Sequence, residues 1–151
     1  MTFSAIAFAP SCDMRRHMAD VIRDGARVEH ELLAPYWIEF DHGGRRWRLT
    51  VPAGTRAAPS VPPSLMDDLP VLGGMWEPSI VHDWCYETRC FDAWDPDGWG
   101  KQFADDLFDA AMEAAGVGWQ DRRAVMTAVW AAGGGMYGRH TLIAGFGPEP
   151  V

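Results

Sequence analysis

The first half of the chain alternates between helical and strand-like spacing of its apolar residues. From 13 to 24 apolar side chains recur every three or four positions and a glycine follows, which predicts a short N-terminal helix. Residues 36–40 and 46–51 are strand-like and bracket the turn sequence DHGG, and in the second run apolar and polar residues alternate. They predict a β-hairpin with one buried and one solvated face. Residues 27–33 are a candidate third strand of the same sheet.

A proline-rich connection separates this part of the chain from a helical part. Prolines between 52 and 63 exclude a helix or a central strand, so residues 52–78 are predicted to form an extended connection and a loop. Helical spacing then returns, and the glycines at 133–135 are interpreted as the end of the last helix. The helical part is predicted at 79–135, with helices at 79–88, 103–115 and 119–132, and a tail at 136–151.

These elements predict a single domain over residues 1–151 with an α+β fold. We expect a small antiparallel β-hairpin or sheet to pack against about three C-terminal helices. The length of 151 residues, with 48% hydrophobic and 23% charged residues, is typical of one globular domain.

Charge and composition exclude several classes of function. Thirteen basic against 21 acidic residues leave a net charge of −8, which disfavours nucleic acid as a partner. No apolar run approaches the roughly 20 residues that span a bilayer, so no membrane span is expected. Cys12, Cys85 and Cys90 cannot all pair within one chain and lack the spacing of a zinc site, which favours free thiols in a reducing cytoplasm.

The densest group of chemically versatile side chains lies in the helix predicted at 79–88. Helical spacing places His82, Asp83 and Tyr86 together on the side opposite the apolar residues. Such a face can bind a divalent metal through His82 and Asp83, or pair an imidazole base with a carboxylate that fixes its tautomer. Asp105, on the next predicted helix, is the candidate carboxylate. The alternative is structural, with His82 hydrogen-bonded in a small core and Asp83 facing water.

A series of motifs runs through most of the chain. In order they are LTVPAG (49–54), SVP (60–62), IVHDWCY (80–86), FADDLFDAAMEAAGV (103–117) and AVWAAGG (128–134). Over residues 36–135 this order resembles a small phage and prophage family, the domain of unknown function number thirteen fifty-three. That family reads roughly V-P-A-G-F-x-T-D-x-A-S-V-P, then H-D-x-x-Y, then A-D-x-x-F. The residues that match the last two motifs are His82, Asp83, Tyr86, Ala104, Asp105 and Phe108.

The chain departs from this pattern at two places. Residues 55–60 are one position shorter than the first motif and hold no acid, and Lys101 stands where an arginine is usual. A lysine keeps the positive charge but not the bidentate geometry of a guanidinium. Both differences favour a role other than catalysis.

The resemblance implies a bacteriophage context, in which two hypotheses stand. The first is a virion or accessory protein that acts through protein–protein contacts of its eight tryptophans and its proline-rich segment, with other phage structural proteins or a second copy of itself as partners. The alternative is a phage-encoded hydrolase, in which His82 is the base or a metal ligand, Asp83 a metal ligand, Asp105 the orienting acid and Tyr86 a hydrogen-bond donor. The expected location is the host cytoplasm during production, and the virion for a particle protein.

Overall fold

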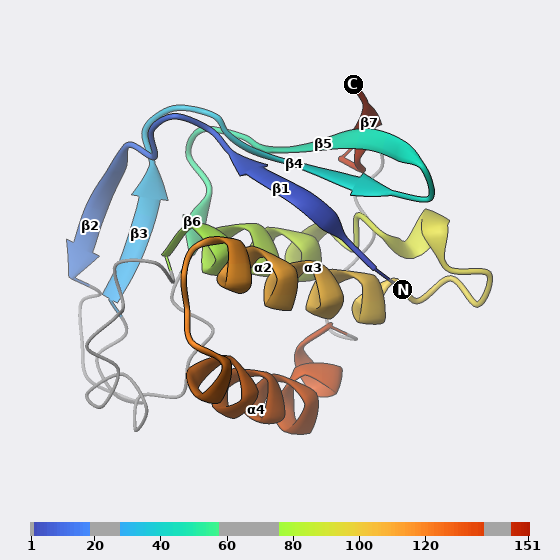
Figure 1. The fold of residues 1–151 in the computed structure, drawn as a ribbon. Coiled ribbons are helices and arrows are strands. Elements are labelled where there is room, and N and C mark those ends of the chain that lie inside the picture. The colour runs from blue at the N-terminus through green and yellow to red at the C-terminus, as the bar shows by residue number, and fades with distance from the viewer. Residues whose placement is uncertain (1, 19–27, 58–75, 138–145) are drawn as a thin grey trace.

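The chain has an α+β fold in the computed structural model, which describes residues 2–18, 28–57, 76–137 and 146–151 (Figure 1). In these ranges two antiparallel sheets lie along one side of a group of helices. Helices α2 and α3 lie beneath the larger sheet, and α4 lies beyond them, away from that sheet. The predicted fold class is therefore confirmed.

The larger sheet is built on the predicted hairpin. Gly43 and Gly44 both have positive φ, +61° and +74°, which a two-residue hairpin turn of this hand requires. Beyond the turn, inward side chains alternate with outward ones along both strands of the hairpin. The sheet has the order β1-β4-β5-β7, with strands β1 Ser4–Phe8, β4 Tyr36–His42, β5 Arg45–Val51 and β7 Glu149–Pro150.

The smaller sheet corrects the prediction of an N-terminal helix. Residues 14–18 form a strand that pairs with 28–32, and the rest of the range 13–24 from residue 19 lies outside the described residues. Hydrogen bonds to a distant segment satisfy the backbone N–H and C=O groups here. This pairing overrides the local spacing of apolar residues, which also fits a helix. The strand expected at 27–33 does form, but in this sheet rather than beside the hairpin. The smaller sheet has the order β2-β3-β6, with strands β2 Met14–Met18, β3 Val28–Leu32 and β6 Arg56–Ala57.

The three predicted helices all form, with shifted ends. They are α2 Trp76–Thr88, α3 Lys101–Ala114 and α4 Trp119–Tyr137, and a short 3-10 turn, η2 Asp92–Trp94, lies between the first two. Helix α3 ends as predicted at Gly116, whose φ is +88°. There the Gly116 and Val117 amides donate to the carbonyls of Glu113 and Met112, which is a Schellman cap.

The C-terminal part differs from its prediction at two points. Helix α4 does not end at residues 133–135 but continues through the three glycines to Tyr137. The predicted tail contains the short strand β7, which pairs with β5, while residues 138–145 lie outside the described part. Glycine lowers helix propensity by only about 1 kcal/mol, which close packing of α4 can offset.

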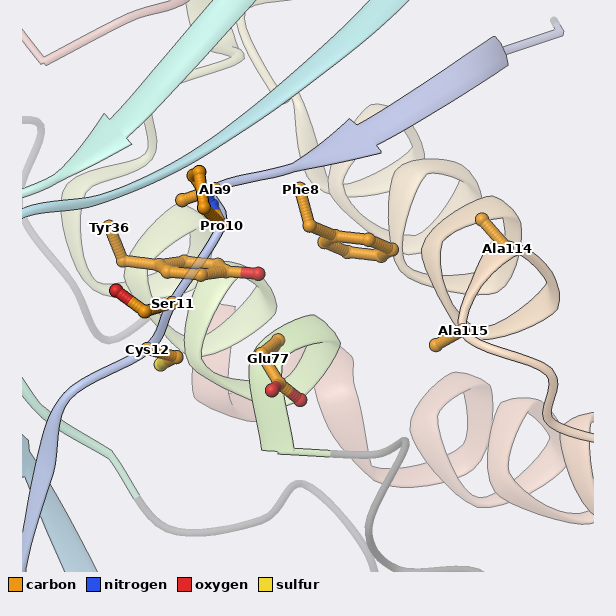
Figure 2. A pocket seen from close by; sticks show the side chains of 9 residues that line it. All are labelled: Phe8, Ala9, Pro10, Ser11, Cys12, Tyr36, Glu77, Ala114 and Ala115. Carbon is orange, nitrogen blue, oxygen red and sulfur yellow. The ribbon is translucent and has the colours of Figure 1, made fainter.

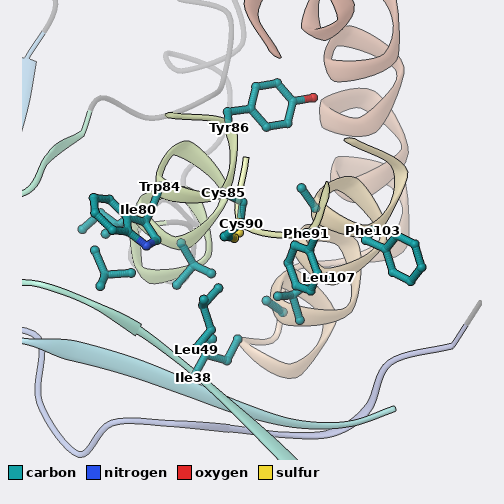
Figure 3. Packing of buried hydrophobic residues seen from close by; sticks show 14 of the residues in the cluster. Ile38, Leu49, Ile80, Trp84, Cys85, Tyr86, Cys90, Phe91, Phe103 and Leu107 are labelled. Atoms are coloured by element: carbon teal, nitrogen blue, oxygen red, sulfur yellow. The ribbon is translucent and has the colours of Figure 1, made fainter. Parts of the chain in front are cut away.

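The main core lies between the larger sheet and helices α2 and α3 (Figure 3). Ile38 and Leu49 face it from the sheet, and Ile80 and Leu107 face it from the helices. A second apolar cluster joins α3 to α4 through Phe108, Met112, Val117, Val125, Met126 and Val129. The two clusters fix α2, α3 and α4 relative to one another. None of the helices in the described residues is long and apolar enough to cross a membrane.

Candidate functional site

His82 and Tyr86 lie one turn apart on α2, on the side that faces α3 and α4. The His82 ring stacks on Phe108 of α3, with ring centroids 4.3 Å apart and planes 17° from parallel. Tyr86 lies on the side of α2 away from the sheet, with its hydroxyl directed toward α4 (Figure 3). The face predicted to be polar and opposite to the apolar residues is therefore buried at His82 and Tyr86.

Asp105 of α3 is the centre of a buried hydrogen-bond network. Its Oδ1 lies 2.9 Å from His82 Nε2 and accepts a hydrogen bond of 2.7 Å from the Tyr86 hydroxyl. Its Oδ2 accepts from Lys101 Nζ at 2.5 Å, one turn back on the same helix. The side chains of His82 and Asp105 are 3% and 1% exposed, so this network, formed by Lys101, Asp105, His82 and Tyr86, is sealed from solvent.

The charges of this network follow from burial and hydrogen bonding. Burial raises the pKa of Asp105, but hydrogen bonds from His82 and Lys101 outweigh it, so the pKa lies below its ordinary value and the group is ionised. Burial lowers the pKa of His82, against the opposing effect of Asp105, and the imidazole is neutral at pH 7. Because an ionised carboxylate only accepts hydrogen bonds, the neutral ring carries its proton on Nε2.

A glycine of α4 lets that helix close over the network. A Cβ on Gly133 would lie 2.5 Å from the Tyr86 hydroxyl and 3.3 Å from Lys101 Nζ. A larger side chain would therefore force Tyr86 and Lys101, or α4 itself, to shift. The glycine run interpreted as a helix end is therefore, at Gly133, a position of close helix packing.

A second buried carboxylate, Asp92, lies beside this network. Its Oδ1 accepts from the Gly100 amide at 2.9 Å and from the Tyr137 hydroxyl, and its Oδ2 lies 2.6 Å from Arg89 Nη2. The Tyr137 ring meets Tyr86 edge to face at a centroid distance of 5.1 Å. The two carboxylates thus each bind one tyrosine and one cation, and the two tyrosines join them.

With this geometry in view, the comparisons with known proteins place the chain in a family. Residues 30–129 match the family model described as "Protein of unknown function (DUF1353)", which is most of the chain. The chain belongs to the DUF1353 family. No curated protein and no solved structure matches it. The family predicted from the motifs is confirmed. The DUF1353 match includes Asp92 and the whole Lys101, Asp105, His82 and Tyr86 network, whereas Gly133 and Tyr137 lie beyond it.

The structure brings three of the four predicted site residues of this DUF1353 chain together. His82, Tyr86 and Asp105 meet, while Asp83 is part-exposed and acts on Tyr86 through its charge. The described residues contain no group of three or more His, Cys, Asp or Glu side chains that could hold a metal ion. His82 and Asp83 are neighbours on a helix, so their side chains diverge by about 100°. The roles predicted for these residues stay predictions.

Other members of the two clusters are not among the residues predicted from the sequence. Lys101 departs from the family motif, and its spacing of four from Asp105 on a predicted helix is a signal for an ion pair. Arg89 lies only three residues before Asp92, but Tyr137 lies 45 residues after it, so no local pattern brings the tyrosine to this carboxylate.

The pockets of this DUF1353 chain lie away from the network. One, of about 350 Å³, lies between the end of β1, the start of β4, the first turn of α2 and the end of α3 (Figure 2). Another, of about 160 Å³, lies beside β5 and β7. Neither is lined by Lys101, Asp105, His82 or Tyr86.

Proposed function

We propose that the chain is a binding protein of the bacteriophage type, a virion or accessory protein that acts through protein–protein contacts. The observation that carries this proposal is a pair of exposed tryptophans on α4. Trp119 is 66% exposed and Trp130 is 50% exposed. Large exposed aromatic side chains on a folded domain are typical of interfaces.

The two tryptophans lie on the same side of the helix. Eleven residues make about three turns, so the two indoles differ by about 20° around the axis and lie about 16 Å apart along it. Arg123 and Thr127 are exposed between them, and the Arg123 guanidinium lies 5.9 Å from the centroid of the Trp119 ring. These four residues define the α4 face. Tryptophan and arginine are the residues most often found to dominate binding energy at interfaces.

The domain itself does not need this surface for folding. Helix α4 packs inward through Val125, Met126 and Val129 at its middle and through Gly133 and Tyr137 near its end. On the same helical geometry Val125 and Val129 lie on the other side of the helix, whereas Met126, Gly133 and Tyr137 lie nearer to the α4 face around the axis. All four side chains of the α4 face are exposed, so they are available for contact with another molecule.

The burial of the polar network also supports a non-enzymatic role. A general base must reach a proton of its substrate, whereas the side chains of His82 and Asp105 are only 3% and 1% exposed. In the proposed role these residues hold three helices together. The partners proposed from the family resemblance are other phage structural proteins or a second copy of the chain, encountered in the host cytoplasm or in the particle.

The test is co-purification with phage structural proteins and with differently tagged copies of the chain. We compare wild type, a double variant Trp119→Glu, Trp130→Glu, and Leu33→Glu, which alters a hydrophobic residue that is also 50% exposed but lies outside α4. We expect wild type and L33E to retain the same partner and the double variant to lose it. Equal retention by all three proteins, or no partner for any, contradicts the proposal.

One observation favours a second candidate, the hydrolase. The 2.9 Å contact between His82 Nε2 and Asp105 Oδ1 is the geometry in which a carboxylate orients an imidazole base. A substrate would have to reach the other nitrogen of a ring whose side chain is only 3% exposed, which requires the helices around it to open. Turnover of a panel of ester and amide substrates that is lost in His82→Gln and kept in Asp106→Asn, which changes a part-exposed acid outside the network, supports this candidate. Turnover in neither wild type nor D106N contradicts it.

A further inference from the structure

The pocket of about 350 Å³ is a separate feature that the α4 face does not explain. Its volume falls at the lower end of the range of small-molecule sites, and it shares no residue with the α4 face. Aromatic, acidic and thiol side chains all reach it (Figure 2). The residues that line it are Phe8, Ala9, Pro10, Ser11, Cys12, Tyr36, Glu77, Ala114 and Ala115.

The Tyr36 hydroxyl is a polar group prepared for a ligand. The residue is only 1% exposed, and its hydroxyl is directed into the pocket between Phe8 and Glu77. None of the hydrogen bonds found among the described residues involves this hydroxyl, and the residue lines the pocket, so its oxygen is free to bond a group placed there. A ligand with a hydrogen-bonding group in the pocket would satisfy it.

The charge of the pocket is negative. Glu77 supplies the only full charge among the described residues that line it. Burial raises the pKa of the Cys12 thiol to about 11, with Glu77 and Asp13 adding to the effect, so this thiol is neutral at pH 7. Glu77 also occupies the first turn of α2, where the helix dipole favours negative charge, so an anionic ligand would meet a site already filled by a carboxylate.

We propose that this pocket binds an organic cation, an ammonium or guanidinium group on a short apolar stem. Glu77 pairs with the cation, and the Tyr36 oxygen accepts one of its N–H groups. The rings of Phe8 and Tyr36 provide apolar contact for the stem and attraction for the charge. The same chemistry belongs to a free amine and to the side chain of a lysine or arginine in a peptide.

Titration calorimetry with propylguanidinium as the probe tests the proposal. Glu77→Gln removes the charge and is expected to weaken binding at least about tenfold, the usual effect of losing a charge-assisted hydrogen bond. Glu87→Gln, an exposed acid on the same helix outside the pocket, is the matched control and is expected to bind like wild type. Ala115→Phe fills the pocket without touching any charge and is expected to abolish binding.

Three results would overturn the proposal. They are no binding of the probe to wild type at concentrations of about 10 mM, equal binding by E77Q and wild type, and equal binding of the neutral analogue butyramide. Thermal melts show whether each variant is folded. Binding of the probe must be weaker in both A115F and E77Q than in wild type. Tighter binding of N-acetylarginine amide than of propylguanidinium assigns the ligand to a peptide side chain, and the reverse order assigns it to a free small cation.

Discussion

Gly133 of α4 lies directly against the hydroxyl of Tyr86 on α2, so closely that a Cβ at this position would be 2.5 Å from the oxygen. The same hydroxyl donates to Asp105, which binds Lys101 and His82. One residue without a side chain therefore controls how tightly α4 closes over the buried network. The following predictions test this network and its surroundings.

Replacing Gly133 with alanine is expected to destabilise the protein by about 1–2 kcal/mol. The clash with Tyr86 and Lys101 costs about 1–3 kcal/mol, and better helix propensity returns up to about 1 kcal/mol. Gly134→Ala is the matched control, because a Cβ there meets nothing within 4 Å, and it is expected to stabilise α4. Urea denaturation of both variants provides the measurement. An equal effect of the two substitutions would show that α4 does not pack on Tyr86 in this way.

The Asp105→Asn substitution is expected to cost about 3 kcal/mol or more in the free energy of unfolding. The substitution leaves the buried Lys101 ammonium without its counter-charge. The NH2 group of the new asparagine would also face a side chain that donates a hydrogen bond rather than accepting one. Asp106→Asn changes the neighbouring acid, which is part-exposed and bonded to Gln102, and should stay within about 0.5 kcal/mol of wild type. Similar unfolding midpoints for the two variants would contradict the central place of Asp105.

Acidification is expected to destabilise the protein from about pH 6.5 downward. Burial holds the pKa of folded His82 below its ordinary 6.5, so the unfolded chain takes up a proton that the folded chain refuses. Stability then falls by up to about 1.4 kcal/mol per pH unit. Asp105 acts in the same direction at lower pH, because its contribution is present above its ordinary pKa of 3.8 and is lost as the pH falls through its lower folded value.

The variant His82→Gln isolates the histidine part of this pH dependence. Denaturation curves between pH 7 and pH 4 should show a shallower loss of stability in H82Q than in wild type, whatever the stability of H82Q at pH 7. Parallel curves for the two proteins would mean that His82 titrates alike in the folded and the unfolded chain.

Gly100→Ala is expected to be among the most damaging single substitutions. A Cβ at residue 100 would lie 2.2 Å from the backbone carbon of Phe91, and the Gly100 amide is the group that donates to Asp92. Backbone atoms cannot move aside as a side chain can, so we expect a loss of about 3 kcal/mol or more, or no folded protein. Gly118→Ala, where a Cβ meets open space, should melt close to wild type. A folded G100A variant with the wild-type melting temperature would contradict the packing at Phe91.

Local patterns predicted much of the helical part and the hairpin. The spacing of apolar residues in 103–115 and the glycine after it placed α3 within two residues, because that helix is strongly amphipathic and has its own cap. The DHGG turn placed β4 and β5 because its two glycines meet the conformation of the turn by themselves. By contrast, residues 14–18 form a strand only because 28–32 lie beside them, which no local pattern records.

The candidate site, too, was predicted only as far as local patterns record it. The order of the motifs determined the family, and helical spacing suggested His82 with Tyr86 and pointed to Asp105. Only the tertiary structure decided that these groups are buried, that Asp83 is part-exposed, and that Tyr36 and Glu77 meet at one pocket. Hydrophobic spacing acts within a few residues, and a sequence displays it directly. Burial, the charge states that follow from burial, and the meeting of distant side chains depend on which elements pack together, and here the absence of a side chain at Gly133 allows that packing.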